Sequence, residues 1–147
     1  MLIYDFDLSQ ERYMNIFSSG NLISENILNE FVDCARISPS LQNKQPKKYV
    51  IVKSKEACSC LFSMCGNLKN INIKPSAYII VLHDKTISNR CDIDTGIVCC
   101  SIALNAQTYG INTIILTDFD KSKLRDYLLI SESNYNIDAV LALGHGL

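Results

Sequence analysis

Glycine and proline are scarce in this sequence, whose 147 residues include 6 Gly and 3 Pro. Hydrophobic residues make up 48% of the chain and charged residues 20%. This composition excludes a disordered tail, a collagen-like repeat and a low-complexity segment. A chain of this length can bury one hydrophobic core but is too short for two. We therefore expect residues 1–147 to form a single domain.

An excess of charge of either sign is also missing. The chain has 14 Lys and Arg against 15 Asp and Glu, for a net charge of −1. A nucleic acid or an anionic lipid surface attracts basic proteins, so we expect neither as a partner. No run approaches 18 apolar residues, and residues 1–7 lack the basic and apolar regions of a secretory signal. We therefore expect no membrane span and a cytoplasmic location.

The seven cysteines are an odd number for a disulfide framework, and no two of them form a C-x-x-C pair. Cys58 and Cys60 would point about 200° apart on a helix, which does not suit a shared metal. We interpret the cysteines as small, reduced core residues and expect no metal site. His83 and His145 are expected in loop or surface positions.

The hydrophobic pattern predicts helices alternating with strands. Helices are expected over residues 10–17, from the cap Ser24 to before Pro39, over Lys55–Met64, over Asp94–Tyr109 and from the cap Asp120 to Leu128. Strands are expected over Tyr49–Val52, Ala77–His83, Ile111–Thr117 and Ile137–Leu143. Arg36 at one helix end, and Asp92 and Asp94 at another helix start, are interpreted as partners of helix dipoles. This order predicts helices packed on one central sheet.

The loop Ser38–Pro46 carries hydroxyls, carboxamides and two prolines in nine residues. Such side chains can bind the polar edge of a flat heterocycle, although the same residues also make an ordinary polar connector. The basic residues beside it, Lys44, Lys47 and Lys48, are interpreted as a solvated turn.

The segment Ala35–Pro46 resembles the "A-R-x-x-P-S-x-x-N-x-Q-P" loop of the flavin-dependent nitroreductases. Asp94-Thr95-Gly96 with its apolar helix, and the last strand Ile137–Gly144, resemble the central helix and last core strand of that family. The resemblance covers residues 23–144 in the family's order.

The resemblance implies an α+β fold with a central mixed sheet flanked by helices, in an intertwined homodimer that binds FMN at the subunit interface. By position, Pro39, Ser40 and Asn43 would contact the isoalloxazine ring. Ile115, Leu116 and Thr117 would lie near its reactive nitrogen. Arg12 matches the segment that holds the FMN phosphate in the family.

We consider three hypotheses on function. The first is an FMN-dependent oxidoreductase that passes a hydride from NAD(P)H to a nitroaromatic, a quinone or a similar acceptor. The second is a relative that has lost FMN and serves a binding or structural role, because Glu11 and Asn15 replace phosphate-binding residues and the family's C-terminal basic pair is missing. A thiol-redox domain using Cys58 and Cys60 is a third alternative, and it requires a low thiol pKa.

Overall fold

The computed structural model describes residues 17–18, 20–68, 74–89 and 92–146. The helices are α1 (Glu25–Arg36), α2 (Lys55–Met64), α3 (Asp92–Thr108) and α4 (Lys121–Leu128), and the strands are β1 (Lys47–Val52), β2 (Ala77–Asp84), β3 (Ile111–Leu116) and β4 (Tyr135–His145). These bounds confirm the four later helices and the four strands predicted above. The helix expected over residues 10–17 lies outside the described residues, apart from Phe17, which is in no helix.

Local capping explains where the helices begin and end. The side chains of Ser24, Ser54 and Asp120 accept hydrogen bonds from backbone amides three residues on, at 3.4, 3.2 and 3.0 Å. Gly110 follows α3 with φ +66°, a left-handed conformation that favours glycine and that turns the chain into β3. The caps predicted at Ser24 and Asp120 are therefore confirmed.

The strands form one sheet in the order β1-β2-β4-β3. All three pairings are antiparallel, so the mixed sheet expected from the family resemblance is wrong for the described strands. The reason is the position of β4. It lies between β2 and β3, which run in the same direction and are joined through α3, so each of them pairs with β4 instead of with the other.

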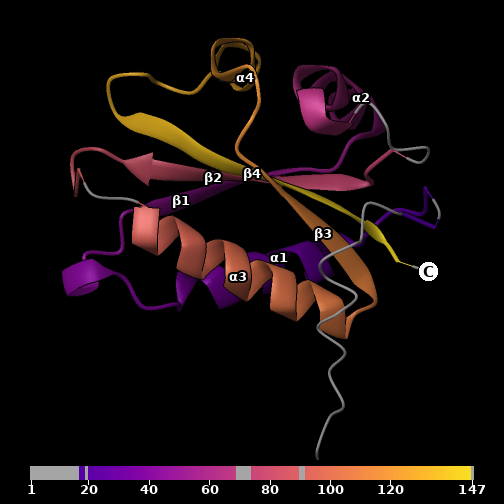
Figure 1. Cartoon of the computed structure of the whole chain (residues 1–147), viewed down its shortest axis with the longest axis horizontal. Coiled ribbons are helices and arrows are strands. Elements are labelled where there is room, and N and C mark those ends of the chain that lie inside the picture. The colour runs from indigo at the N-terminus through magenta and orange to yellow at the C-terminus, as the bar shows by residue number, and fades with distance from the viewer. Residues whose placement is uncertain (1–16, 19, 69–73, 90–91, 147) are drawn as a thin grey trace, which may run out of the picture.

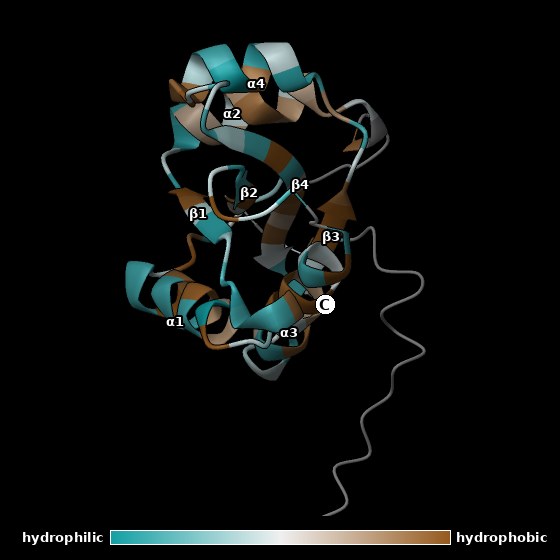
Figure 2. Cartoon of the chain, turned by 90° about the vertical axis from the view of Figure 1, so that its left-hand side faces the viewer, coloured by the Kyte–Doolittle hydropathy of each residue, from teal (hydrophilic) through white to brown (hydrophobic). Residues whose placement is uncertain are grey.

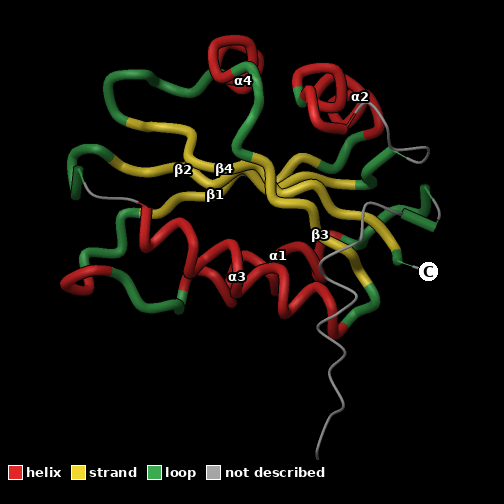
Figure 3. Tube along the Cα trace, viewed as in Figure 1, coloured by secondary structure: helices red, strands yellow, loops and turns green. Residues whose placement is uncertain are grey.

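Helices cover both faces of this sheet, α1 and α3 on one side and α2 and α4 on the other (Figures 1 and 3). Figure 2 shows the two helical layers edge-on, with the sheet between them. Alternate residues of β2 therefore face two separate cores: Ile79 packs with α1 and α3, and Ile80 packs with α2 and α4. Among the helices that the structure describes, none is long and apolar enough to cross a bilayer.

For several single residues, the burial in the structure differs from the burial predicted from the sequence. Cys58, Cys65 and Cys99 are buried as expected, and burial raises the pKa of each thiol to about 11. The raised pKa of Cys58 argues against the thiol-redox alternative. The core assignment is wrong for Cys60 and Cys100, which are exposed. Within the described part of the chain, no group of His, Cys, Asp and Glu could hold a metal ion.

The expectation for His83 is wrong as well. This histidine is buried in β2, where its Nε2 contacts the carbonyl of Ser88. β2 continues one residue beyond its predicted end, to Asp84, so His83 lies within the strand and pairs with Asn136 of β4 instead of lying in a loop.

Candidate functional site

The loop Ser38–Pro46 has an unusual backbone. Gln42, Asn43 and Gln45 all have positive φ angles, between 51° and 54°, which residues other than glycine adopt rarely. Side chains of the loop hold this shape. The Ser40 hydroxyl accepts a hydrogen bond from the Gln45 amide at 2.8 Å, and the Asn43 side-chain oxygen accepts one from Gln45 Nε2 at 3.0 Å. The loop is therefore more than a flexible connector.

Asp94 ties this loop to α3. Its side chain is buried, and its Oδ1 accepts a hydrogen bond from the backbone amide of Leu41 at 2.8 Å. The sequence predicts for Asp94 a role as an acidic residue at a helix N-terminus and as part of the Asp94-Thr95-Gly96 motif. The structure adds a second role, because the carboxylate reaches a loop that lies 53 residues earlier in the sequence.

Two cavities flank the start of α3. The first, the loop cavity, has a volume of about 420 Å³. Its lining includes Pro39, Ser40, Arg36, Lys48, Tyr49 and Asp94. Burial raises the pKa of Tyr49, so its hydroxyl stays protonated near neutral pH. The loop cavity thus combines the exposed cations Arg36 and Lys48 with the buried charged groups of Lys47 and Asp94 and with neutral hydrogen-bonding groups.

The second, the strand-end cavity, has a volume of about 450 Å³ and lies where β3 leaves the sheet. Its apolar lining includes Ile115, Ala139 and Cys100, and its polar lining includes Thr117, Lys121, Asn136 and Asp138. Ile115 is 47% exposed although it is a large hydrophobic residue of a strand. An exposed apolar wall beside a few polar groups is typical of a small-molecule site.

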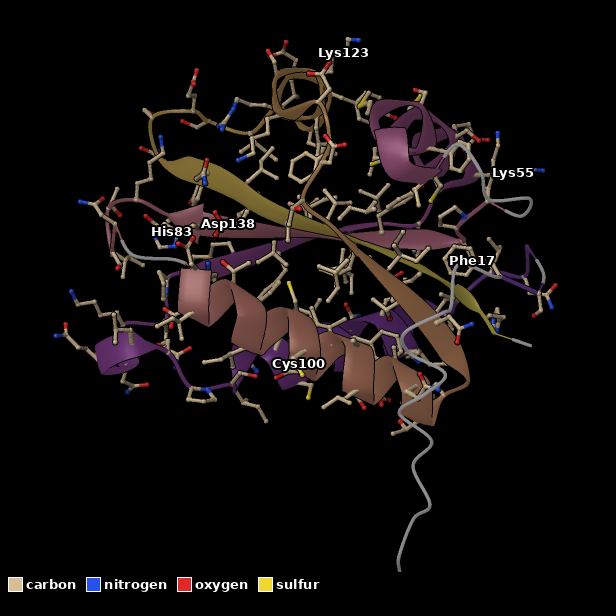
Figure 4. The ribbon with its side chains drawn as sticks, in the orientation of Figure 1. Phe17, Lys55, His83, Cys100, Lys123 and Asp138 are labelled. Atoms are coloured by element: carbon tan, nitrogen blue, oxygen red, sulfur yellow. The ribbon has the colours of Figure 1, made fainter. Side chains whose placement is uncertain are left out.

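A buried ion pair lies between the two cavities. Lys47 Nζ lies 2.6 Å from Asp138 Oδ2, and both side chains are only 5% exposed. Lys47 Nζ also donates to Thr95 Oγ1 at 2.6 Å, and Asn136 Nδ2 donates to Asp138 Oδ1 at 2.7 Å. Lys47 belongs to the lining of the loop cavity, and Asp138 to that of the strand-end cavity. In Figure 4, Asp138 lies between the sheet and the start of α3, and Cys100 lies further along that helix.

The interpretation of Lys47 as part of a solvated turn is therefore wrong, whereas Lys44 and Lys48 are exposed as expected. Sequence analysis missed Lys47, Asp138 and Asn136 as residues of the site. A signal was present, since Asp138 is a lone charge inside the apolar strand Ile137–Leu143. A charge in such a strand needs a buried partner, and the pattern alone does not say which one.

The predicted site residues separate into groups within one chain. Pro39 and Ser40 line the loop cavity, and Ile115 and Thr117 line the strand-end cavity. Asn43 is exposed and lines neither cavity, and Leu116 packs in the core beneath α2 and α4. Arg12 lies outside the described residues. One chain therefore does not bring the predicted set together around a single cavity.

Comparison with solved structures identifies the architecture. A nitroreductase family protein from Clostridium difficile 630 is similar with a TM-score of 0.78 and 22% identity, over 94% of this chain and 81% of that one. A putative NADH oxidase from Clostridium acetobutylicum is similar with a TM-score of 0.79 and 16% identity, over 94% and 86% of the two chains. The chain has the nitroreductase fold.

A third structure with the nitroreductase fold is described as containing FMN. It is a putative nitroreductase from Exiguobacterium sibiricum in complex with FMN, with a TM-score of 0.75 and 17% identity, over 90% of this chain and 83% of that one. No protein-family model matches the sequence, and the curated proteins give no match. The nitroreductase fold is therefore evident from the tertiary structure at a low level of sequence identity.

Most of the lining of the strand-end cavity has the chemistry that a flavin ring requires, although Asp92 adds a carboxylate. Ile115 and Ala139 offer an apolar surface for a flat ring, and Asn136 and Thr117 offer polar groups for the edge of such a ring. Lys121, in the first turn of α4, supplies a positive charge at the same cavity. The carboxylate of Asp138 is neutralised by Lys47 and so does not leave an unpaired negative charge there.

Proposed function

We propose that this protein is an FMN-dependent oxidoreductase that uses NAD(P)H to reduce a nitroaromatic, a quinone or a similar acceptor. The observation that carries this proposal is the strand-end cavity, in which the half-exposed Ile115 faces open space beside Thr117, Asn136 and Asp138. The nitroreductase fold supports the same assignment.

FMN, when bound, supplies the hydride chemistry, so the protein needs no nucleophile of its own. The chain's own residues would bind the flavin and orient its ring. Ile115 and Ala139 would exclude water from one face of the site, while Thr117 and Asn136 offer hydrogen bonds at its edge. The Lys47–Asp138 pair would hold α3, β1 and β4 in fixed relative positions behind the site.

We propose further that the site is completed by a second copy of the chain. Ile93, Ile97, Cys100 and Leu104 recur along α3 at spacings of four, three and four residues, which places them on one helical face. Ile93 is 70% exposed and Leu104 is 40% exposed. An exposed apolar helical face favours association, and a homodimer could bring Pro39, Ser40 and Asn43 of one copy to the strand-end cavity of the other.

Two observations favour the alternative, a protein that has lost FMN and acts by binding or as a structural component. The hydroxyl of Ser40 and the side-chain oxygen of Asn43 each accept a hydrogen bond from Gln45 within the same loop. Groups that are already paired have less capacity left for a ligand. Asp92 also adds a carboxylate to the strand-end cavity, which disfavours an anion there.

A flavin titration separates the two functions. We expect purified protein to bind FMN with a visible flavin spectrum and quenched flavin fluorescence. Ile115→Asp should weaken FMN binding at least tenfold, because it places a charge on the apolar wall. Leu129→Asp is the matched control, since Leu129 is 91% exposed at the end of α4 and lines none of the described cavities.

Absence of any flavin signal at excess FMN would contradict the enzymatic proposal and support the alternative. Equal FMN affinity for Ile115→Asp and the wild-type protein would contradict the assignment of the site. Far-ultraviolet circular dichroism of both variants checks that the fold is retained.

A further inference from the structure

Asn136 of β4 is a half-buried amide side chain whose orientation the structure fixes. It lines the strand-end cavity together with Asp138 and Thr95. Its Nδ2 donates a hydrogen bond to Asp138 Oδ1 at 2.7 Å. If the amide were turned over, its carbonyl oxygen would face that carboxylate oxygen, and the two acceptors would repel each other. The contact with Asp138 therefore decides which way the amide of Asn136 points.

The carboxylate of Asp138 is itself held from its other side. Its Oδ2 accepts hydrogen bonds from Lys47 Nζ at 2.6 Å and from Thr95 Oγ1 at 3.2 Å. Lys47 Nζ also donates to Thr95 Oγ1 at 2.6 Å, which closes a triangle of contacts. The side chains of Lys47 and Asp138 are each 5% exposed. With Oδ2 occupied in this way, Oδ1 keeps its direction towards Asn136.

The side-chain oxygen of Asn136 is left for a ligand. Within the described part of the chain, the hydrogen bond to Asp138 is the only one that the Asn136 side chain makes. Asn136 Oδ1 therefore has no donor there, and it is not shut off from solvent. A half-buried acceptor with a fixed direction favours a ligand that brings a donor to it.

Oxidised FMN carries such a donor on the edge of its ring system. This edge has a single N–H, which lies between two carbonyl oxygens, and the other ring nitrogens are acceptors. The apolar residues that could cover the ring, Ile115 and Ala139, line the same cavity as Asn136. The remaining hydrogen on Asn136 Nδ2 suits a carbonyl oxygen beside the N–H. The amide and this edge of the ring are therefore complementary.

Thr117, the other neutral polar residue named above at this cavity, imposes no such choice. It is exposed, and its hydroxyl can rotate to donate or to accept. It would bind the edge of a ring with or without an N–H. Selection for the N–H therefore falls to Asn136.

We infer that Asn136 Oδ1 accepts a hydrogen bond from the ring N–H of FMN, and that Asp138 is the positioning residue that presents this oxygen to the cavity. The inference rests on the proposed function, since it concerns the same cofactor at the strand-end cavity. It adds a selectivity, because the site should distinguish FMN from a flavin that is methylated at this nitrogen.

The test compares the affinities of the full chain for oxidised FMN and for oxidised 3-methyl-FMN, measured by quenching of flavin fluorescence. The methyl group replaces the N–H and leaves Asn136 Oδ1 without a donor. We expect the wild-type protein to bind FMN at least tenfold more tightly than 3-methyl-FMN. Asn136→Ala should bind the two flavins with nearly equal affinity.

Asn134→Ala is the matched control. Asn134 is exposed in the turn before β4 and lines neither the loop cavity nor the strand-end cavity. This variant should keep the wild-type ratio of the two affinities.

The double variant Lys47→Met/Asp138→Leu tests the positioning role of Asp138. It removes both charges, so it leaves no unpaired charge in the interior. The amide of Asn136 can then turn over, and we expect the preference for FMN over 3-methyl-FMN to fall severalfold. General damage to the site would weaken both flavins alike and leave the ratio unchanged. In the flavin-free wild-type protein, NMR should show slow exchange of the Asn136 side-chain amide with water, because Asp138 holds it.

Each outcome decides a different part of the inference. Absence of binding by both flavins would overturn the proposed function and the inference together. Equal affinities in the wild-type protein, or the wild-type ratio in Asn136→Ala, would overturn the inference while FMN binding stands. The wild-type ratio in the double variant, or fast exchange of the Asn136 side-chain amide, would overturn the role of Asp138.

Discussion

At the scale of single residues, the Lys47–Asp138 pair joins the end of the loop Ser38–Pro46 to the strand β4. Lys47 directly follows the Gln45-Pro46 pair in the sequence. Its ammonium group is buried against Asp138 and Thr95, and Lys47 lines the loop cavity. Two charges taken out of water depend on each other, so neither can be removed alone without cost.

This dependence predicts a strongly non-additive double-mutant cycle. Lys47→Met or Asp138→Asn alone should lower the free energy of unfolding by about 3–5 kcal/mol, because each leaves a partner charge unpaired in the interior. The double variant should be more stable than either single variant. Urea denaturation of the four proteins measures the coupling, and additive losses would show that water, rather than the partner, solvates the remaining charge.

At the scale of elements, two glycines differ in whether the structure leaves room for a side chain at their position. Gly144 in β4 lies against Phe17, and a Cβ built there would come closer than 3.0 Å to three atoms of the ring. Gly96 in α3 has no atom within 4 Å of such a Cβ. The absence of a side chain is therefore a packing requirement at Gly144, but not at Gly96.

The glycine pair predicts stability changes of opposite sign. Gly144→Ala should lower the free energy of unfolding by about 1–3 kcal/mol, because the Phe17 ring must move out of a filled core. Gly96→Ala should raise it by about 0.5–1 kcal/mol, because alanine favours the helix interior. Thermal or urea denaturation compares the two with the wild-type protein. A loss of stability in Gly96→Ala would mean that the surface of α3 at Gly96 is covered, for example by a second copy of the chain.

At the scale of the whole molecule, the loop cavity and the strand-end cavity are separate in one chain. The proposed site therefore depends on how two copies of the chain assemble. The apolar face of α3 that includes Cys100 and Leu104 is exposed in one chain. If this face is the contact between two copies, a charge placed on it should separate them.

We expect the wild-type protein to sediment as a dimer and Leu104→Glu to sediment as a monomer in analytical ultracentrifugation. Loss of FMN affinity should accompany the loss of the dimer, because the site would need both copies. Leu129→Glu, at the exposed end of α4, is the control and should remain dimeric. A monomeric wild-type protein, or a Leu104→Glu dimer, would contradict this assembly.

The sequence by itself determined the four later helices and the four strands, with ends within two residues of those observed, because these features depend mainly on neighbours. The hydrophobic spacing of α1, the cap at Ser24 and the left-handed Gly110 each act within a few residues. The tertiary structure alone decided what depends on distant segments. It decided that β4 separates β2 from β3, that Lys47 meets Asp138 across 91 residues, and that the predicted site residues divide between two cavities. A local pattern shows that a buried charge needs a partner or that a strand needs a neighbour, but only packing selects which one.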